Sequence, residues 1–172
     1  LSGIATGLSD LDRMMGGLQP SDLVILAGRP GMGKTALATN IAYNVARAWQ
    51  GEVKADGRIA TVNGGIVGFF SLEMSGEQLA TRIIAEQSEI ASYRIRRGEI
   101  DAGDFDRIVE ITREMESIPL YIDETGGLTI AQLSARARRL KRQRGLDLLV
   151  VDYLQLLGGS SKRASEGRVQ EV

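Results

Sequence analysis

The sequence predicts an α/β fold with a mostly parallel sheet flanked by helices, and two observations support this prediction. Short apolar runs rich in branched residues alternate with longer segments whose apolar residues recur at spacings of three and four. Each apolar run is followed by loop-forming residues, as expected of buried strands. This alternation is typical of a parallel sheet, because a helix usually connects one parallel strand to the next.

The apolar runs predict four buried strands, at residues 23–27, 66–70, 120–122 and 148–151. Helices are predicted at residues 34–48, 75–88, 104–117 and 129–144. Two of these helices have the spacing of a capping box, in which a hydroxyl side chain and an amide side chain three residues later bind each other's backbone N–H groups. The two pairs are Ser75 with Gln78 and Thr129 with Gln132, and they indicate where these helices begin.

The composition is that of one domain with a buried core, since 43% of the 172 residues are hydrophobic. The 21 basic residues nearly balance 22 acidic ones, and the net charge is −1. This balance argues against a broadly basic surface, so any contact with nucleic acid must be local or shared among subunits. No apolar run approaches the ~18 residues that span a bilayer, and the first residues lack the order of a signal peptide. We expect a cytoplasmic protein with no membrane partner.

The chain contains neither histidine nor cysteine. This excludes a disulfide framework, a thiol nucleophile, an imidazole base and a zinc site of the usual kind. Any catalysis must therefore use carboxylates, lysine, arginine, hydroxyl groups or a hard metal ion.

A phosphate-binding loop is the clearest motif in the sequence. It fits the pattern G-x-x-x-x-G-K-[ST] between a predicted strand and a predicted helix, which is the context that the motif requires. Its glycines let backbone N–H groups curl around a phosphate, and the helix N-terminus adds its positive dipole end. A glycine-rich turn with a chance lysine and threonine is the alternative. The nucleotide-binding residues predicted from this motif are Gly28, Arg29, Pro30, Gly31, Met32, Gly33, Lys34, Thr35 and Ala36.

Magnesium is expected beside the phosphates of the nucleotide. In loops of this kind the lysine, here Lys34, reaches the β- and γ-phosphates, and the threonine, here Thr35, places its hydroxyl on Mg²⁺. A carboxylate at the end of a neighbouring apolar strand usually completes the metal site. Asp152 ends the run at 148–151 and is the candidate, although aspartate is also common where a strand turns into a loop.

Hydrolysis also needs a group that activates or orients water, and without histidine this must be a carboxylate at the carboxyl edge of the sheet. Glu73 follows the run at 66–70 and is the candidate catalytic residue alongside Lys34. A glutamate that merely favours the N-terminus of the next helix is the alternative, and position alone does not separate the two. Asp123 and Glu124 are weaker candidates of the same kind.

The last predicted helix is strongly basic. Its apolar side is expected to hold Ile130, Leu133, Ala137 and Leu140. The basic residues on the rest of the helix surface have two interpretations. They contact DNA or another subunit, or they form a solvated face on which positive charges near the helix C-terminus interact favourably with the helix dipole. A smaller cluster of Arg94, Arg96 and Arg97 has the same two interpretations. The basic residues of the helix are Arg136, Arg138, Arg139, Lys141, Arg142 and Arg144.

Two segments carry expectations about domain organisation. Residues 50–65 contain glycine and asparagine and are expected to form an inserted loop or hairpin without a catalytic role. Near the end of the chain, a polar loop at 158–161 precedes the entry to a helix at 164–172. This pattern suggests that the sequence stops inside a domain.

Several strings resemble the RecA-like ATPases and, among them, the ATPase domain of the DnaB family of bacterial replicative DNA helicases. The stretch 6–18 (TGLSDLDRMMGGL), which leads toward the phosphate-binding loop, is similar to the opening of RecA-like ATPases. The strings FSLEM at 70–74, PLYIDE at 119–124 and VDYLQL at 151–156 are similar to the DnaB family. SLEM and DYLQL are far more specific than the loop, and the resemblance covers essentially the whole chain.

The resemblance implies a RecA-like P-loop core in a homohexameric ring that couples ATP hydrolysis to 5′ to 3′ translocation on single-stranded DNA and to duplex unwinding during replication. It implies that Lys34 and Thr35 hold phosphate and Mg²⁺, that Asp152 is the acidic residue of the second strand, and that Glu73 activates water. It also implies primase and a helicase loader as partners of the full-length protein, at the replication fork in the bacterial nucleoid.

The chain also departs from the family pattern. From the resemblance, we expect the family's basic finger, its γ-phosphate sensor strand and most of its DNA-binding loops to correspond to positions beyond Val172, and its N-terminal primase-interacting domain to be absent from residues 1–172. Residues 1–172 are therefore expected to form a partial RecA-like ATPase domain, incomplete at the C-terminal end. Two other classes stay open: a recombination ATPase of the RecA or RadA type that forms filaments on DNA, and a nucleotide-dependent switch or loader that binds a protein.

Overall fold

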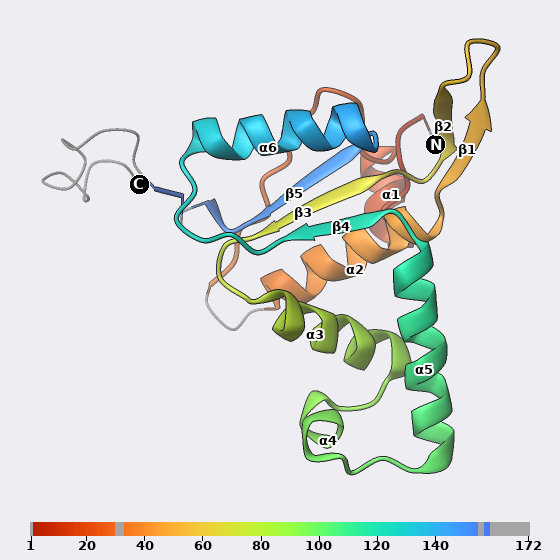
Figure 1. Cartoon of the computed structure of the whole chain (residues 1–172), viewed down its shortest axis with the longest axis vertical. Helices are drawn as coiled ribbons and strands as arrows, with labels where there is room; N and C mark the ends of the chain where they lie inside the picture. The colour runs from red at the N-terminus through yellow and green to blue at the C-terminus, as the bar shows by residue number, and fades with distance from the viewer. Residues whose placement is uncertain (1, 30–32, 155–156, 159–172) are drawn as a thin grey trace, which may run out of the picture.

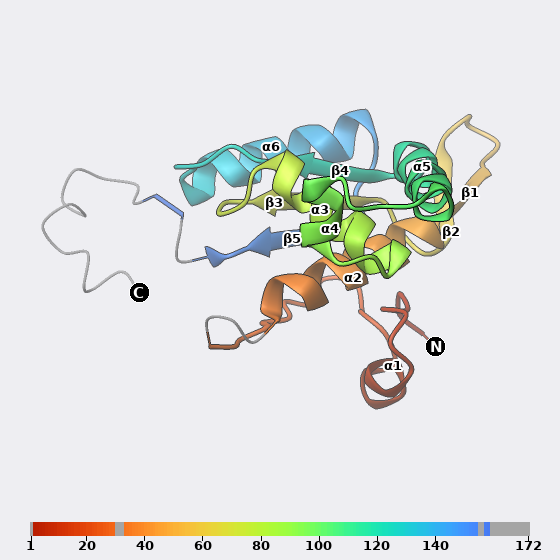
Figure 2. The same cartoon turned by 90° about the horizontal axis from the view of Figure 1, so that it is seen from below.

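The fold is built around a three-stranded parallel sheet in the order β4-β3-β5. The computed structural model describes residues 2–29, 33–154 and 157–158. The central strand β3 (Val67–Ser71) pairs with β4 (Leu120–Asp123) on one side and with β5 (Leu148–Asp152) on the other. Helix α2 (Lys34–Arg47) covers one face of the sheet and α6 (Ile130–Gln143) covers the other (Figure 1 and Figure 2). The predicted α/β fold with a parallel sheet flanked by helices is confirmed.

The central strand is buried along its whole length, and its side chains alternate between two cores. Val67 and Phe69 join the core formed with α2 and with α3 (Gly76–Ser88), whereas Phe70 packs in the core under α6. Gly68 also faces α6, because a Cβ at this position would lie 2.8 Å from Leu140 Cδ2. The missing side chain thus lets α6 approach the sheet closely.

Capping boxes begin three of the helices. Ser75 with Gln78 caps α3 and Thr129 with Gln132 caps α6, as the sequence predicts. A third box, formed by Asp101 and Asp104, begins α5 (Ala102–Ser117). The predicted start of this helix at residue 104 is two residues late, because an Asp–Asp pair lacks the hydroxyl–amide pattern that revealed the other two boxes.

Two short helices, α1 (Ser9–Met15) and α4 (Ser92–Arg97), were not predicted. The stretch that leads into α1 is held by Asp12, whose carboxylate accepts hydrogen bonds from the Thr6 backbone N–H at 2.8 Å and from the Thr6 hydroxyl at 2.7 Å. Burial raises the pKa of Asp12, but the hydrogen bonds from Thr6 and Gly7 outweigh it and bring the pKa below its ordinary value. Asp12 therefore has a structural role in the 6–18 stretch.

An antiparallel hairpin projects from the end of the sheet at which the parallel strands begin (Figure 1). It consists of β1 (Gln50–Val53) and β2 (Ile59–Asn63), within the segment expected to be an inserted loop or hairpin. The Trp49 indole N–H donates to the Thr61 hydroxyl at 3.0 Å, and that hydroxyl donates to Asp147 Oδ2 at 2.8 Å. The same oxygen accepts the Ile66 backbone N–H at 2.8 Å. A short hydrogen-bond chain thus ties the hairpin to the residue before β5.

The predicted strand at residues 23–27 is wrong. This segment forms no strand within the described part of the chain, and Leu23 and Ile25 are 83% and 71% exposed. Branched apolar residues favour extended backbone, but a strand also needs a neighbour that shares its backbone hydrogen bonds. None of the strands described above pairs with this segment. The expected helix entry at 164–172 and the polar loop from residue 159 lie outside the described residues.

None of the helices in the described ranges is long and apolar enough to cross a membrane.

Candidate active site

The predicted phosphate-binding loop is followed directly by α2. Gly28 and Arg29 precede Pro30, Gly31 and Met32, which lie outside the described residues, and Gly33 caps the helix. Gly33 has a φ of 77°, a left-handed conformation that favours glycine. Lys34, Thr35 and Ala36 then form the first turn of α2, where free backbone N–H groups and the helix dipole attract anions. In the described part of the chain, the helix expected after the loop is present, and the strand expected before it is not.

Asp152, at the carboxyl end of β5, lies against this first turn. Its side chain is buried, with the residue 4% exposed, and its Oδ2 accepts a hydrogen bond from the Thr35 hydroxyl at 2.9 Å. The Lys34 ammonium lies 3.9 Å from Asp152 Oδ1. The fold thus brings together the three predicted residues for phosphate and metal, although Asp152 is 117 positions from Thr35.

Tyr153 is a neighbour of the site that sequence reasoning missed. Its ring centroid lies 4.2 Å from the Lys34 ammonium, within the range of a cation–π contact. The signals in the sequence were its position next to Asp152 and its place in the DYLQL string.

Thr39 and Glu86, which sequence reasoning also missed, contact the first turn of α2. The Thr39 hydroxyl lies 3.0 Å from the Thr35 carbonyl oxygen and 2.9 Å from that of Ala36. It also lies 3.1 Å from Glu86 Oε2 on α3. Burial raises the pKa of Glu86 above its ordinary value, although the Thr39 hydrogen bond and the Arg82 charge act against this. The contact links α2, which carries Lys34, to α3.

Glu73 lies in the turn between β3 and α3, beside the end of β5. Ser71 is opposite Asp152 in the sheet register, and the Leu72 backbone N–H donates to the Asp152 carbonyl at 2.9 Å. The buried Ser71 hydroxyl donates to the Met74 carbonyl at 2.7 Å and closes the turn. Glu73 itself is exposed, and no hydrogen bond or ion pair to its carboxylate occurs within the described residues.

The two weaker candidates, Asp123 and Glu124, are bound into the structure. Asp123 accepts hydrogen bonds from the Arg136 guanidinium at 2.9 Å and from the Thr125 backbone N–H at 3.0 Å. Burial raises the pKa of Asp123, but the hydrogen bonds from Thr125 and Arg136 outweigh it and bring the pKa below its ordinary value. Glu124 accepts the Gly76 backbone N–H at the N-terminus of α3. Both carboxylates therefore stabilise the carboxyl edge of the sheet.

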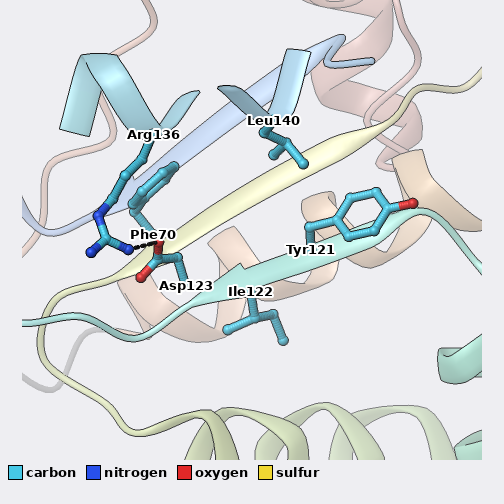
Figure 3. Close-up of a pocket in the computed structure, with 6 residues that line it drawn as sticks. All are labelled: Phe70, Tyr121, Ile122, Asp123, Arg136 and Leu140. Carbon is cyan, nitrogen blue, oxygen red and sulfur yellow. Dashed lines mark hydrogen bonds and ion pairs between the residues drawn. The ribbon is translucent and has the colours of Figure 1, made fainter. Parts of the chain in front are cut away.

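The Arg136 side chain lies at a hollow between α6 and the sheet (Figure 3). Phe70, Tyr121 and Leu140 line it, and Arg136 reaches across its end to Asp123. Ile122 points away from Leu140 toward the opposite face of the sheet.

The other basic residues of the helix segment are exposed, in agreement with a face that points away from the core. Ile130 is 63% exposed, contrary to the expected apolar side. It is the first residue of α6, and helical side chains lean toward the N-terminus, where no preceding turn exists for Ile130 to cover.

The edge that holds Thr35 and Asp152 offers oxygen atoms to a metal ion. Within the described ranges, no group of three or more acidic side chains is arranged to hold a metal. Thr35 and Asp152 supply a hydroxyl and a carboxylate oxygen side by side, which suits the preference of Mg²⁺ for oxygen ligands shared with substrate phosphates.

Comparison with known proteins gives consistent matches. Residues 3–172 match the family described as DnaB-like helicase C terminal domain. A protein named replicative DNA helicase DnaB from Rickettsia bellii is 46% identical over 170 residues, which are 99% of this chain and 33% of that protein. The chain thus spans about a third of the length of that protein and of a relative of the same name from Geobacillus stearothermophilus.

Two solved structures share the fold. One is described as an ATPase domain, with a TM-score of 0.78 and 27% identity over 93% of this chain and 52% of that one. The other is described as a DnaB-like replicative helicase and its interactions with primase, with a TM-score of 0.79 and 26% identity over 94% of this chain and 37% of that one.

Proposed function

The chain belongs to the family of DnaB-like helicase C-terminal domains, and from this membership we propose that it is the ATPase unit of a replicative DNA helicase. The observation that carries the proposal is the contact between Thr35 and Asp152 at the first turn of α2, with Lys34 beside them. Hydroxyl, carboxylate and ammonium groups in this arrangement suit a magnesium nucleotide at a helix N-terminus. We propose that the nucleotide is ATP.

In this proposal Lys34 binds the β- and γ-phosphates, and the backbone N–H groups of the loop cradle them. Thr35 and Asp152 orient Mg²⁺, which when bound offsets the negative charge that develops on the transferred phosphoryl group. The Thr35–Asp152 hydrogen bond, at 2.9 Å, supports this role because it already places the two oxygens on one side of the helix N-terminus.

Glu73 is the proposed group that accepts a proton from the attacking water. Two features support it: the turn closed by Ser71 holds Glu73 next to the end of β5, and its exposed carboxylate can contact water at this edge. Asp123 and Glu124, by contrast, are hydrogen-bonded to Arg136 and to the N-terminus of α3.

The activity of the whole protein is likewise a proposal. From the names of its relatives we propose that the whole protein unwinds duplex DNA during replication and has primase as a partner. From the family resemblance we further propose a homohexameric ring that translocates 5′ to 3′ along single-stranded DNA, with a helicase loader as a second partner. Its place would be the replication fork in the cytoplasm. The exposed basic residues of α6 are compatible with a DNA or subunit contact, and a solvated face is equally compatible with them.

Steady-state ATP hydrolysis by the native protein that contains this chain, with and without single-stranded DNA, tests the proposal. We expect DNA to stimulate hydrolysis strongly and Lys34→Ala to lose nucleotide affinity. Absence of stimulation would favour a nucleotide-dependent switch instead. Electron microscopy of the protein on DNA then separates a closed ring from the filament of a recombination ATPase.

A further inference from the structure

The Lys34 ammonium lies between two groups that attract it, the ring of Tyr153 and the carboxylate of Asp152. Lys34 Nζ is 4.2 Å from the ring centroid and 3.9 Å from Asp152 Oδ1. A direct hydrogen-bonded ion pair between ammonium and carboxylate is shorter, at about 2.7–2.9 Å. The lysine is therefore near Asp152 without being bound directly to it.

This separation matters because the two charges have different tasks in the proposed nucleotide site. The Lys34 side chain is 26% exposed and that of Asp152 is 5% exposed, so a direct pair between them would be only weakly screened by water. Such a pair would occupy the carboxylate required for the metal and the ammonium required for the phosphates. The aromatic face attracts an ammonium without using any carboxylate oxygen. Asp152 Oδ2 meanwhile keeps its bond from Thr35.

We propose that Tyr153 is a positioning residue that holds the Lys34 ammonium off Asp152, so that the lysine stays available to phosphate and the aspartate to the metal. The inference rests on the proposed nucleotide site and adds a residue to it. It assigns the effect to the ring face of Tyr153, so phenylalanine should replace tyrosine and an aliphatic residue should not.

The test measures equilibrium binding of a fluorescent ATP analogue to the native protein at a series of Mg²⁺ concentrations. We expect Tyr153→Phe to stay within about twofold of the unaltered protein, and Tyr153→Leu to need about fivefold more Mg²⁺ for half-maximal binding and to bind the analogue about fivefold more weakly. Tyr121→Leu is the matched control, because Tyr121 lines the hollow under α6 (Figure 3), on the face of the sheet opposite to α2, which carries Lys34. It should leave the Mg²⁺ midpoint unchanged.

Because the leucine variant could disturb the loop after β5, a second series replaces Tyr153 with phenylalanines of increasing fluorine content. These rings keep nearly the same shape while their faces lose negative charge, so the Mg²⁺ midpoint should rise stepwise with fluorination. Equal midpoints across this series, or equal behaviour of the phenylalanine and leucine variants, would overturn the role of Tyr153 while leaving the nucleotide site intact. If the unaltered protein binds no nucleotide in the presence of Mg²⁺, both the proposed function and this role are wrong.

Discussion

An aspartate lies at each end of strand β5, and each accepts a hydrogen bond from a threonine hydroxyl. The two aspartates nevertheless lie in different surroundings. Asp147, just before the strand, accepts a threonine hydroxyl at 2.8 Å and a backbone N–H at 2.8 Å. Asp152, at its carboxyl end, accepts a threonine hydroxyl at 2.9 Å. Asp147 is exposed and its partners are the hairpin and the start of β3, whereas Asp152 is buried beside Lys34 and the first turn of α2.

The difference shows that the chemistry of a carboxylate at a strand end depends on what else converges there. At the amino end of the sheet, the Thr61 hydroxyl and the Ile66 backbone N–H donate to the Asp147 carboxylate, which connects the hairpin to the sheet. At the carboxyl end, a helix N-terminus and an ammonium lie beside the Asp152 carboxylate, and the turn that carries the exposed Glu73 lies at the same edge, as expected for ligand sites in open α/β sheets. Each of the following predictions tests this contrast.

The largest effect is expected at Glu73. Glu73→Gln should lower the kcat for ATP hydrolysis roughly 1,000-fold and change nucleotide affinity by less than about twofold, because the amide cannot accept the proton from water. Pre-steady-state and steady-state ATPase assays measure the kcat, and equilibrium binding measures the nucleotide affinity. Glu124→Gln, at the same edge but bonded to the N-terminus of α3, is the control and should keep most of the turnover. Normal turnover in the Glu73 variant would remove Glu73 from the mechanism.

The second-largest effect is expected at Asp152, where the loss of hydrolysis is compared with that at Asp147. Asp152→Asn should lower Mg²⁺-dependent hydrolysis about 100-fold, since the neutral amide is a poor magnesium ligand. Asp147→Asn should leave hydrolysis within about twofold, because its partners Thr61 and Ile66 lie at the opposite end of the sheet from the proposed nucleotide site. Activity at a series of Mg²⁺ concentrations measures both. Equal losses in the two variants would contradict the division between the ends of β5.

A smaller effect, on stability, is expected at the amino end. Asp147→Ala removes the acceptor for Thr61 and for Ile66, and should cost about 1–2 kcal/mol of local stability in the hairpin. Hydrogen exchange of the β1 and β2 amides should then become faster, while exchange in β3 stays slow because that strand is buried on both faces. Uniform acceleration over the whole sheet would show that the hairpin and the sheet open together.

The smallest expected effect concerns pH and the Asp123–Arg136 ion pair. The folded-state pKa of Asp123 lies below the ordinary value of 3.8, so its contribution to stability is present above about pH 4 and is lost as the pH falls through the folded-state pKa. Arg136→Met should therefore cost about 0.5 kcal/mol at neutral pH and nearly nothing in strong acid. Urea unfolding at both pH values, with the exposed Arg138→Met as control, measures the difference. A cost that does not change with pH would assign the effect to packing.

Features that depend on neighbours in the sequence could be predicted well. Ser75 and Thr129 revealed the starts of α3 and α6, because a capping box is encoded within four residues. The strands β3, β4 and β5 were predicted to within a residue or two, since strands of a parallel sheet covered by helices carry short continuous apolar runs. Lys34 and Thr35 were identified by the loop motif, and their roles stay predictions.

Features that depend on distant neighbours could not be predicted. Residues 23–27 have the composition of a strand but lack a described partner, which no local pattern reveals. The contact of Thr39 with Glu86 joins two helices, and the contact of Lys34 with Tyr153 joins α2 to the loop after β5. Sequence reasoning could place Glu73, Asp123 and Glu124 at one edge, but only the structure shows which two of them have structural partners.

The hairpin of β1 and β2 also bears on how the chain tolerates insertions and deletions during evolution. Its two ends lie against each other, since Gln50 is paired with Asn63 and the Gly65 N–H donates to the Val45 carbonyl at 3.0 Å. A segment whose ends already meet can be lengthened, shortened or exchanged without moving the elements that it joins. Because the hairpin sits at the amino end of the sheet, such changes would leave the opposite edge untouched. Selection can therefore act on the two ends of the domain separately.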